Sequence, residues 1–136
     1  MLTSHNVLDD IITLLKGSEL CGAVSGSVYR KGYRPRDSRN EDIIVMFVNG
    51  IPGQVERGAV TLNIYVPDIT PYNDGVFVEN GRRTAAIEKL ALRWVESLTA
   101  NKTDYKFKLL RTISTANDEA IHQHFVVVQL EYDYKL

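Results

Sequence analysis

The run DIIVMFV at residues 42–48 constrains the fold more than any other segment, because after its first residue it has no polar face. Its residues are β-branched and aromatic side chains with one methionine. A short continuous run of this kind is typical of a strand that is covered on both faces. The sequence therefore predicts a central strand here, and the rest of the chain must supply neighbouring strands and covering layers.

Four other segments predict strands: 23–30, 59–66, 105–110 and 121–134. Segment 59–66 alternates cleanly and places Val60, Leu62, Ile64 and Val66 on the core face. With residues 42–48 it predicts an antiparallel hairpin whose long tip is the turn-rich segment 49–58. Gly26, within 23–30, predicts a bulge or a close backbone approach. Residues 112–119 are predicted to form a polar turn.

Two segments predict helices. Segment 4–16 has apolar residues at spacings of three and four, with Ser4 as the expected N-cap and Gly17 at a left-handed C-cap. Segment 80–99 has an apolar stripe that contains Ile87, Leu90, Ala91, Trp94, Val95 and Leu98. We expect Trp94 to be buried against the sheet, since one apolar stripe on a helix has to pack against another layer.

These elements predict an α+β fold with the order α-β-β-β-α-β-β: a mostly antiparallel sheet with two helices packed on one face. The chain has 136 residues, 44% of them hydrophobic and 24% charged, so we expect one domain over residues 1–136. No run is long and apolar enough for a membrane helix, and residues 1–15 lack the features of a signal peptide. The sequence favours a soluble protein of the cytoplasm.

Residues that could carry catalysis are few. His122 and His124 form an HxH pair, which on a strand places both rings on one face about 7 Å apart. A tight metal site needs a further ligand that the sequence does not indicate, so we expect no bound transition metal and no cofactor. Cys21 is the only cysteine, which excludes a disulfide within the chain. It is interpreted as a small core residue rather than a nucleophile, and no phosphate-binding glycine motif is present.

Residues 30–42, RKGYRPRDSRNED, form the one unusual loop. Five of the 16 basic residues of the chain fall within ten positions of it, next to one aromatic residue. The candidate partner-binding residues are Arg30, Lys31, Tyr33, Arg34, Arg36 and Arg39. Three interpretations stay open: a solvated loop with local ion pairs to Asp37, Glu41 and Asp42, a protein–protein contact, or a grip on nucleic acid. We expect the loop to project from the body, because Gly32 and Pro35 prevent either neighbouring strand from continuing through it.

The loop at residues 67–79 is the other candidate contact surface. It begins PDITPYNDG and continues with the apolar triplet Val76-Phe77-Val78, which predicts a short extra strand. If these apolar side chains are exposed, they would form a docking surface. Long loops on a small domain without a catalytic set favour contacts over reactions.

The order and length of the elements resemble those of the small tail-terminator and tail-completion (head–tail joining) proteins of tailed bacteriophages and prophages. The local features that carry the resemblance are GSVYRKGYRP (residues 26–35), EDIIVMFV (41–48) and AVTLNIYVPDI (59–69). Members of that family form rings, commonly six-fold, that cap the tail tube and join it to the head. The resemblance implies a structural protein of the virion, or of a bacterial host's cytoplasm, without catalytic residues.

The sequence thus favours a non-enzymatic assembly protein. Its expected partners are further copies of itself and the proteins of the tail tube or head–tail connector. A contact with DNA stays open but is not expected to be specific, and no membrane partner is expected. The alternative is a small nucleic-acid- or ligand-binding module that uses the Arg30–Arg39 loop, and a more distant one is an enzyme that uses His122 and His124. The net charge of −1 excludes a generally basic nucleic-acid coat.

Overall fold

The computed structural model describes residues 1–100 and 103–135. Its helices are α1 (Ser4–Leu15), α2 (Glu19–Ala23), α3 (Gly81–Leu98) and the short 3-10 helix η1 (Glu119–Ile121). Its strands are β1 (Val28–Arg30), β2 (Ile43–Ile51), β3 (Val55–Pro67), β4 (Tyr105–Leu109), β5 (Ser114–Asp118) and β6 (Gln123–Lys135).

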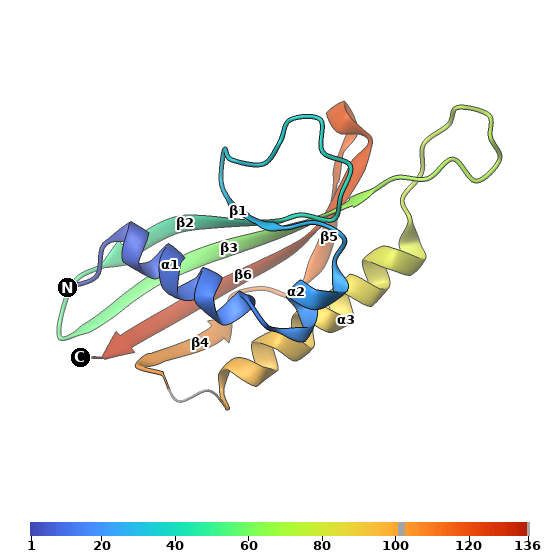
Figure 1. Cartoon of the computed structure of the whole chain (residues 1–136). Helices are drawn as coiled ribbons and strands as arrows, with labels where there is room; N and C mark the ends of the chain where they lie inside the picture. Colours follow the sequence, from blue (N-terminus) through green and yellow to red (C-terminus); the bar gives the residue numbers. More distant parts are fainter. Residues whose placement is uncertain (101–102, 136) are drawn as a thin grey trace.

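The strands form one twisted sheet with the order β1-β2-β3-β6-β4, in which β5 pairs with β6 beyond β4. Only β1 and β2 are parallel, and all other pairs are antiparallel. The helices α1 and α3 lie across the same face of the sheet (Figure 1). The expected α+β class and order of elements are confirmed, and the structure adds the short elements α2, β5 and η1.

The core lies between the helices and the inner face of the sheet. Strands β3 and β6 pair along 13 residues, and alternate residues of both strands are fully buried. Trp94 on α3 is 4% exposed and packs in the same apolar cluster as Leu62 and Ile64. Its indole Nε1 donates to the Leu14 carbonyl at 3.3 Å, which joins α3 to the end of α1. The predicted burial of Trp94 is therefore confirmed.

Helix α1 matches the expected segment, but its N-cap lies one residue earlier than expected. Thr3, not Ser4, is the N-cap: its hydroxyl accepts from the Asn6 amide, and the Asn6 side chain accepts from the Thr3 amide. Reciprocal bonds of this kind satisfy two amides that the helix leaves unpaired. Gly17 follows the helix with a φ of +80°, which is the left-handed conformation predicted for it at the end of the helix.

The expected strand 23–30 is mostly wrong, because only Val28–Arg30 is a strand. Residues 19–23 form helix α2 instead, capped by Ser18, whose Oγ accepts from the Cys21 amide. The predicted close approach at Gly26 is confirmed, since a side chain there would collide with the backbone carbonyl of Glu41 and the carboxylate of Asp42. The backbone of this segment lies against residues 41–42 and so reaches the sheet edge only at Val28.

The predicted long hairpin tip is also wrong, because β2 continues to Ile51 and β3 begins at Val55. Gly50 and Gly58 are paired strand residues rather than turn residues. The Tyr132 hydroxyl lies where a side chain on either glycine would project, so the glycines make room for this ring. A close approach of this kind, and not a turn, is the reason for glycine at both positions.

Strand β2 lies between β1 and β3 at Ile43–Val45, and these three residues are buried, so the expected central strand is confirmed over this part. Beyond Val45 it pairs with β3 alone, and β3 is the middle strand of the sheet. One further segment differs from expectation. Residues 114–118 form strand β5 and not a polar turn. Its polar composition, STAND, suits an edge strand that is half exposed and paired on one side.

Candidate functional site

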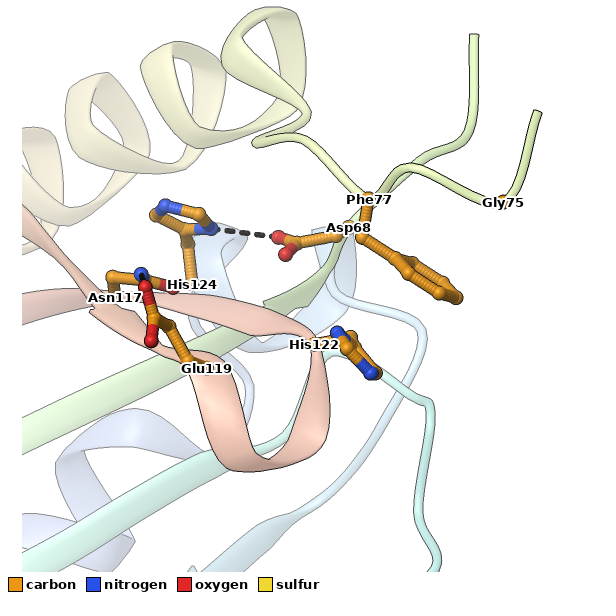
Figure 2. A pocket seen from close by; sticks show the side chains of 7 residues that line it. All are labelled: Asp68, Gly75, Phe77, Asn117, Glu119, His122 and His124. Carbon is orange, nitrogen blue, oxygen red and sulfur yellow. Dashed lines mark hydrogen bonds and ion pairs between the residues drawn. The ribbon is translucent and has the colours of Figure 1, made fainter. Parts of the chain in front are cut away.

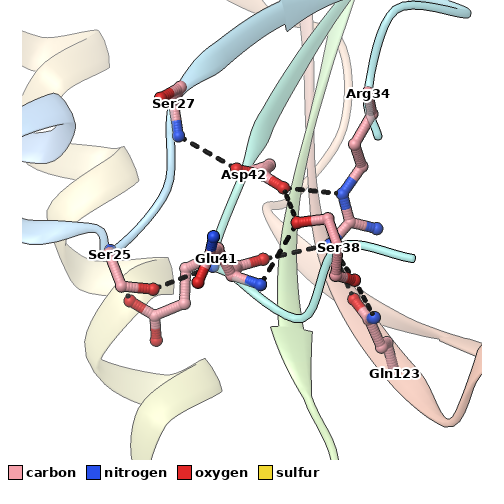
Figure 3. Close-up of polar contacts among 8 residues, drawn as sticks. Ser25, Ser27, Arg34, Ser38, Glu41, Asp42 and Gln123 are labelled. Atoms are coloured by element: carbon pink, nitrogen blue, oxygen red, sulfur yellow. Dashed lines mark hydrogen bonds and ion pairs between the residues drawn. The ribbon is translucent and has the colours of Figure 1, made fainter. Parts of the chain in front are cut away.

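The residues that the sequence singled out gather at one end of the sheet, where β1, β2, β3 and β6 begin or end. Asp42 lies directly before β2 and is 1% exposed. Its carboxylate accepts from Arg34 Nε at 2.9 Å, from the Ser38 hydroxyl at 2.5 Å and from the Ser27 amide at 2.9 Å (Figure 3). Burial alone would raise the pKa of Asp42, but the bonds from Arg34, Ser38 and Ser27 together hold that pKa below its usual value.

Arg34 also links this loop to the far end of the chain. Its Nη2 donates to the Asn40 carbonyl at 3.0 Å and to Gln123 Oε1 at 2.9 Å. Gln123 in turn donates to the Ser38 carbonyl, and the Arg34 guanidinium lies 4.2 Å from the centre of the Tyr65 ring. The expectation that Arg34 projects from the body is wrong, because this side chain contacts the buried residues Asp42 and Gln123 and the ring of Tyr65.

The other candidate residues divide into two groups. Arg30 pairs with Asp9 and contacts the His5 ring on α1, while Arg39 donates to the Ile121 carbonyl of η1 at 3.1 Å. These contacts hold the segment at both of its ends.

Lys31, Tyr33 and Arg36 point to solvent, with Tyr33 76% exposed. Within residues 1–100 and 103–135, neither Lys31 nor Arg36 makes an ion pair. The structure thus leaves three of the six candidate residues available for a partner.

Arg83 on α3 is an important polar residue that the sequence did not single out. Its guanidinium donates to both Glu41 oxygens at 2.6 and 2.8 Å and to the Ala23 carbonyl at 2.6 Å. The hydrogen bond to Glu41 raises the pKa of Arg83, although burial opposes this. Glu41 also accepts from the Ser25 amide, so one ion pair joins α3, the end of α2 and the start of β2. A single arginine on a charged helix face carried no signal that would have identified it.

A pocket of about 420 Å³ lies next to this network, below the start of α3 (Figure 2). It is lined by Asp68, Gly75, Phe77, Asn117, Glu119, His122 and His124. His124 Nδ1 lies 2.6 Å from Asp68 Oδ1, and its Nε2 lies 3.8 Å from Glu79 Oε1. Because a carboxylate accepts, the Nδ1 atom carries the proton in this contact.

The two histidines do not share one strand face, contrary to the expected HxH geometry. His122 has a φ of 52° and follows η1, so it lies outside β6. Its ring stacks on Phe77 with centroids 4.1 Å apart, while His124 points toward Asp68 (Figure 2). Among the residues that the structure describes, no group of three His, Cys, Asp or Glu side chains is arranged to hold a metal ion.

The pocket contains one element of a nucleophilic site but not the others. A carboxylate that orients a histidine is typical of a general base, which then needs a hydroxyl or thiol within reach. The described residues that line the pocket include neither, and Cys21 lies on α2 outside this lining. What His124 and Asp68 do here is join the beginning of β6 to the end of β3.

Residues 69–78 form an arm that extends away from the body beyond the start of α3 (Figure 1). Its two ends are joined by backbone bonds in both directions between Ile69 and Val78, each 2.9 Å long, so the predicted extra strand is a single bridge. The Asp74 carboxylate accepts from the Val76 amide and shapes the tip. The apolar side chains are exposed, most of all Tyr72, at 84%. The arm is therefore a projection that is closed at its base by the bridge and carries an apolar surface.

No protein-family model matches the chain, and no curated protein matches it in sequence. None of the helices in the described part of the chain has the length and apolar character needed to cross a bilayer.

Proposed function

We propose that this chain is a non-enzymatic assembly subunit of the phage or prophage tail-terminator type, which forms a homo-oligomeric ring and caps a tail tube. The observation that carries the proposal is the arm at residues 69–78. A domain of this size that keeps most large apolar side chains inside has no folding reason to hold Tyr72 and Val76 on a projection, where they are 84% and 57% exposed. Such a surface suits contact with another protein.

The polar residues at the same end of the sheet support a structural role. Asp42 and Asp68 are both occupied by cations or donors of their own chain, and both connect segments that are distant in sequence. Their contacts hold the bases of the Arg30–Arg39 segment and of the arm in defined positions. A subunit that binds by surface complementarity gains from such preorganisation, because less freedom is lost on association. The proposal places the protein in a bacterial cytoplasm and then in the virion.

The test is the mass and shape of the purified full chain. Sedimentation velocity at increasing concentration should show a species several times heavier than the 15.4 kDa monomer, and electron microscopy should show rings. Replacing Tyr72 and Val76 by serine should shift the protein to monomer with an unchanged unfolding midpoint. The matched control replaces Val48 and Ile51, exposed apolar residues of β2, by serine. A chain that stays monomeric up to about 100 μM, where micromolar contacts saturate, contradicts the proposal.

The second candidate function is nucleic-acid binding, and one observation favours it. Tyr33 is exposed between two solvent-facing cations, Lys31 and Arg36, which is an arrangement that suits phosphates and a stacked base. If this is the function, replacing these three residues by alanine removes DNA affinity and lowers the salt slope by roughly 0.9 per lost contact. Under the assembly proposal, the wild type and the triple alanine variant both bind DNA weakly at physiological salt.

A further inference from the structure

A second apolar surface lies along the side of α3 that faces the connection between β4 and β5. It is a groove of about 420 Å³ between the outer face of α3 and the segment that joins β4 to β5. Ala85 and Leu92 line it from the helix, and Leu109 and Ile113 line it from the other side. Leu92 is 44% exposed, and Leu110 next to the groove is exposed to a similar degree. The groove thus presents apolar side chains to solvent, as the arm does.

The charges around the groove and on the arm are opposite. Lys89 lines the groove and Arg111 directly precedes its residue Thr112. In the described part of the chain neither cation makes an ion pair. Glu88, the acid in the lining, accepts a hydrogen bond from the Thr115 hydroxyl at 2.6 Å.

The arm and its base carry only acids. Residues 67–79 contain Asp68, Asp74 and Glu79 and no lysine or arginine. Asp68 and Glu79 lie at the base, near His124, so Asp74 is the carboxylate at the tip. An apolar projection with an acidic tip and an apolar groove with a basic rim are complementary in both polarity and charge.

We propose that the arm of one copy docks in the groove between α3 and the β4–β5 connection of a second copy. Tyr72 and Val76 would fill the apolar groove, and Asp74 would pair with Lys89 and Arg111. The arm leads away from α3 in its own chain (Figure 1), so the contact joins different copies. Each copy then uses its arm on one neighbour and its groove on another, and such head-to-tail contacts close into a ring when the rotation permits. This inference rests on the proposed function, since it names the contact by which the ring would form.

Charge reversal tests the pairing. We expect Asp74→Lys to raise the concentration for half assembly about tenfold, and Lys89→Glu with Arg111→Glu to do the same. Combining all three reversals should restore assembly to within about threefold of wild type, because the charges again attract. If Asp74→Lys weakened assembly only by breaking the hydrogen bond from the Val76 amide, the two reversals in the groove would not restore assembly. Asp104→Lys is the matched control, since this exposed acid lies before β4, at the end remote from Leu109.

Cysteine cross-linking tests the location. In a Cys21→Ser background, chains carrying only Val76→Cys are mixed with chains carrying only Leu92→Cys and oxidised with diamide. A disulfide-linked dimer should form in the mixture far faster than with Gln54→Cys in place of Leu92→Cys.

Rings that persist in all charge variants without this cross-link would overturn the arm-in-groove contact and leave the proposed function standing. A wild-type chain that remains monomeric would overturn both.

Discussion

Removing the Arg34 side chain should lower the free energy of unfolding of this small protein by a large fraction. The pair of Arg34 and Asp42 is buried, with side chains 12% and 2% exposed. Arg34→Ala leaves the Asp42 carboxylate in place with only the Ser27 and Ser38 donors. Breaking a buried pair on one side costs about 3–5 kcal/mol, because the remaining charge is neither solvated nor paired. The total free energy of unfolding of a natural domain is about 5–15 kcal/mol.

Urea unfolding followed by Trp94 fluorescence measures this loss, with Arg36→Ala as the control. Arg36 is exposed, so its removal should change the free energy of unfolding by no more than about 0.5 kcal/mol. For Arg34→Ala the midpoint should fall by about 1–3 M urea. A loss below about 1 kcal/mol would show that the network around Asp42 is loosely packed or reached by water.

The same variant should show a pH dependence of defined sign. In the wild type the pKa of Asp42 is held below its ordinary 3.8, so the pair adds stability above that pH and loses it as the pH falls through the folded value. In Arg34→Ala burial dominates and favours the protonated acid. The difference between the two proteins should therefore shrink from pH 7 to pH 3. An equal difference at both pH values would refute the assignment of the effect to Asp42.

Three other substitutions test the core and the sheet. Trp94→Ala should cost about 3–5 kcal/mol in urea unfolding, since the indole is buried between helix and sheet. Gly58→Ala should cost about 1–3 kcal/mol because the methyl group meets the Asn49 carbonyl and the Tyr132 ring, whereas Gly22→Ala, with open space around it, should not destabilise. Tyr105→Phe removes the 2.6 Å bond to Asp10 and should cost about 1.5–3 kcal/mol in thermal unfolding. In the wild type, burial and this bond raise the pKa of Tyr105, so a spectrophotometric titration should show that Tyr105 ionises at a higher pH than free tyrosine does.

The sequence was sufficient wherever periodicity and burial act together. The apolar stripe of α3 predicted its bounds to within a residue and the burial of Trp94. The alternation in 59–66 predicted the core face of β3, because each face of a strand meets a different environment. These patterns arise because apolar side chains are moved out of water on folding, and the spacing of those side chains is visible within each segment.

Elements held by distant partners could not be predicted in the same way. Gly50 and Gly58 indicated a turn, whereas in the structure both lie in strands and the Tyr132 hydroxyl, far along the chain, occupies the space beside each of them. Strand β5 is polar and depends on pairing with β6.

Arg34 looked like any exposed arginine, because its partner Gln123 lies at the beginning of the last strand. At the candidate site the sequence singled out segments that the structure brings together, but it did not indicate which of their side chains face inward.

The place of β6 in the sheet has a consequence for synthesis of the protein. The middle strand β3 has β6 as its longest partner, from Val55 opposite Lys135 to Pro67 opposite Gln123. Residues 123–135 therefore complete the centre of the sheet only after all the other strands have been synthesised, and contacts so distant in sequence form slowly. A nascent chain has no finished inner face for α3 to cover and no β6 to hold β4 and β5 beside the groove. If the proposed ring forms, chains that still lack β6 would be unable to enter it.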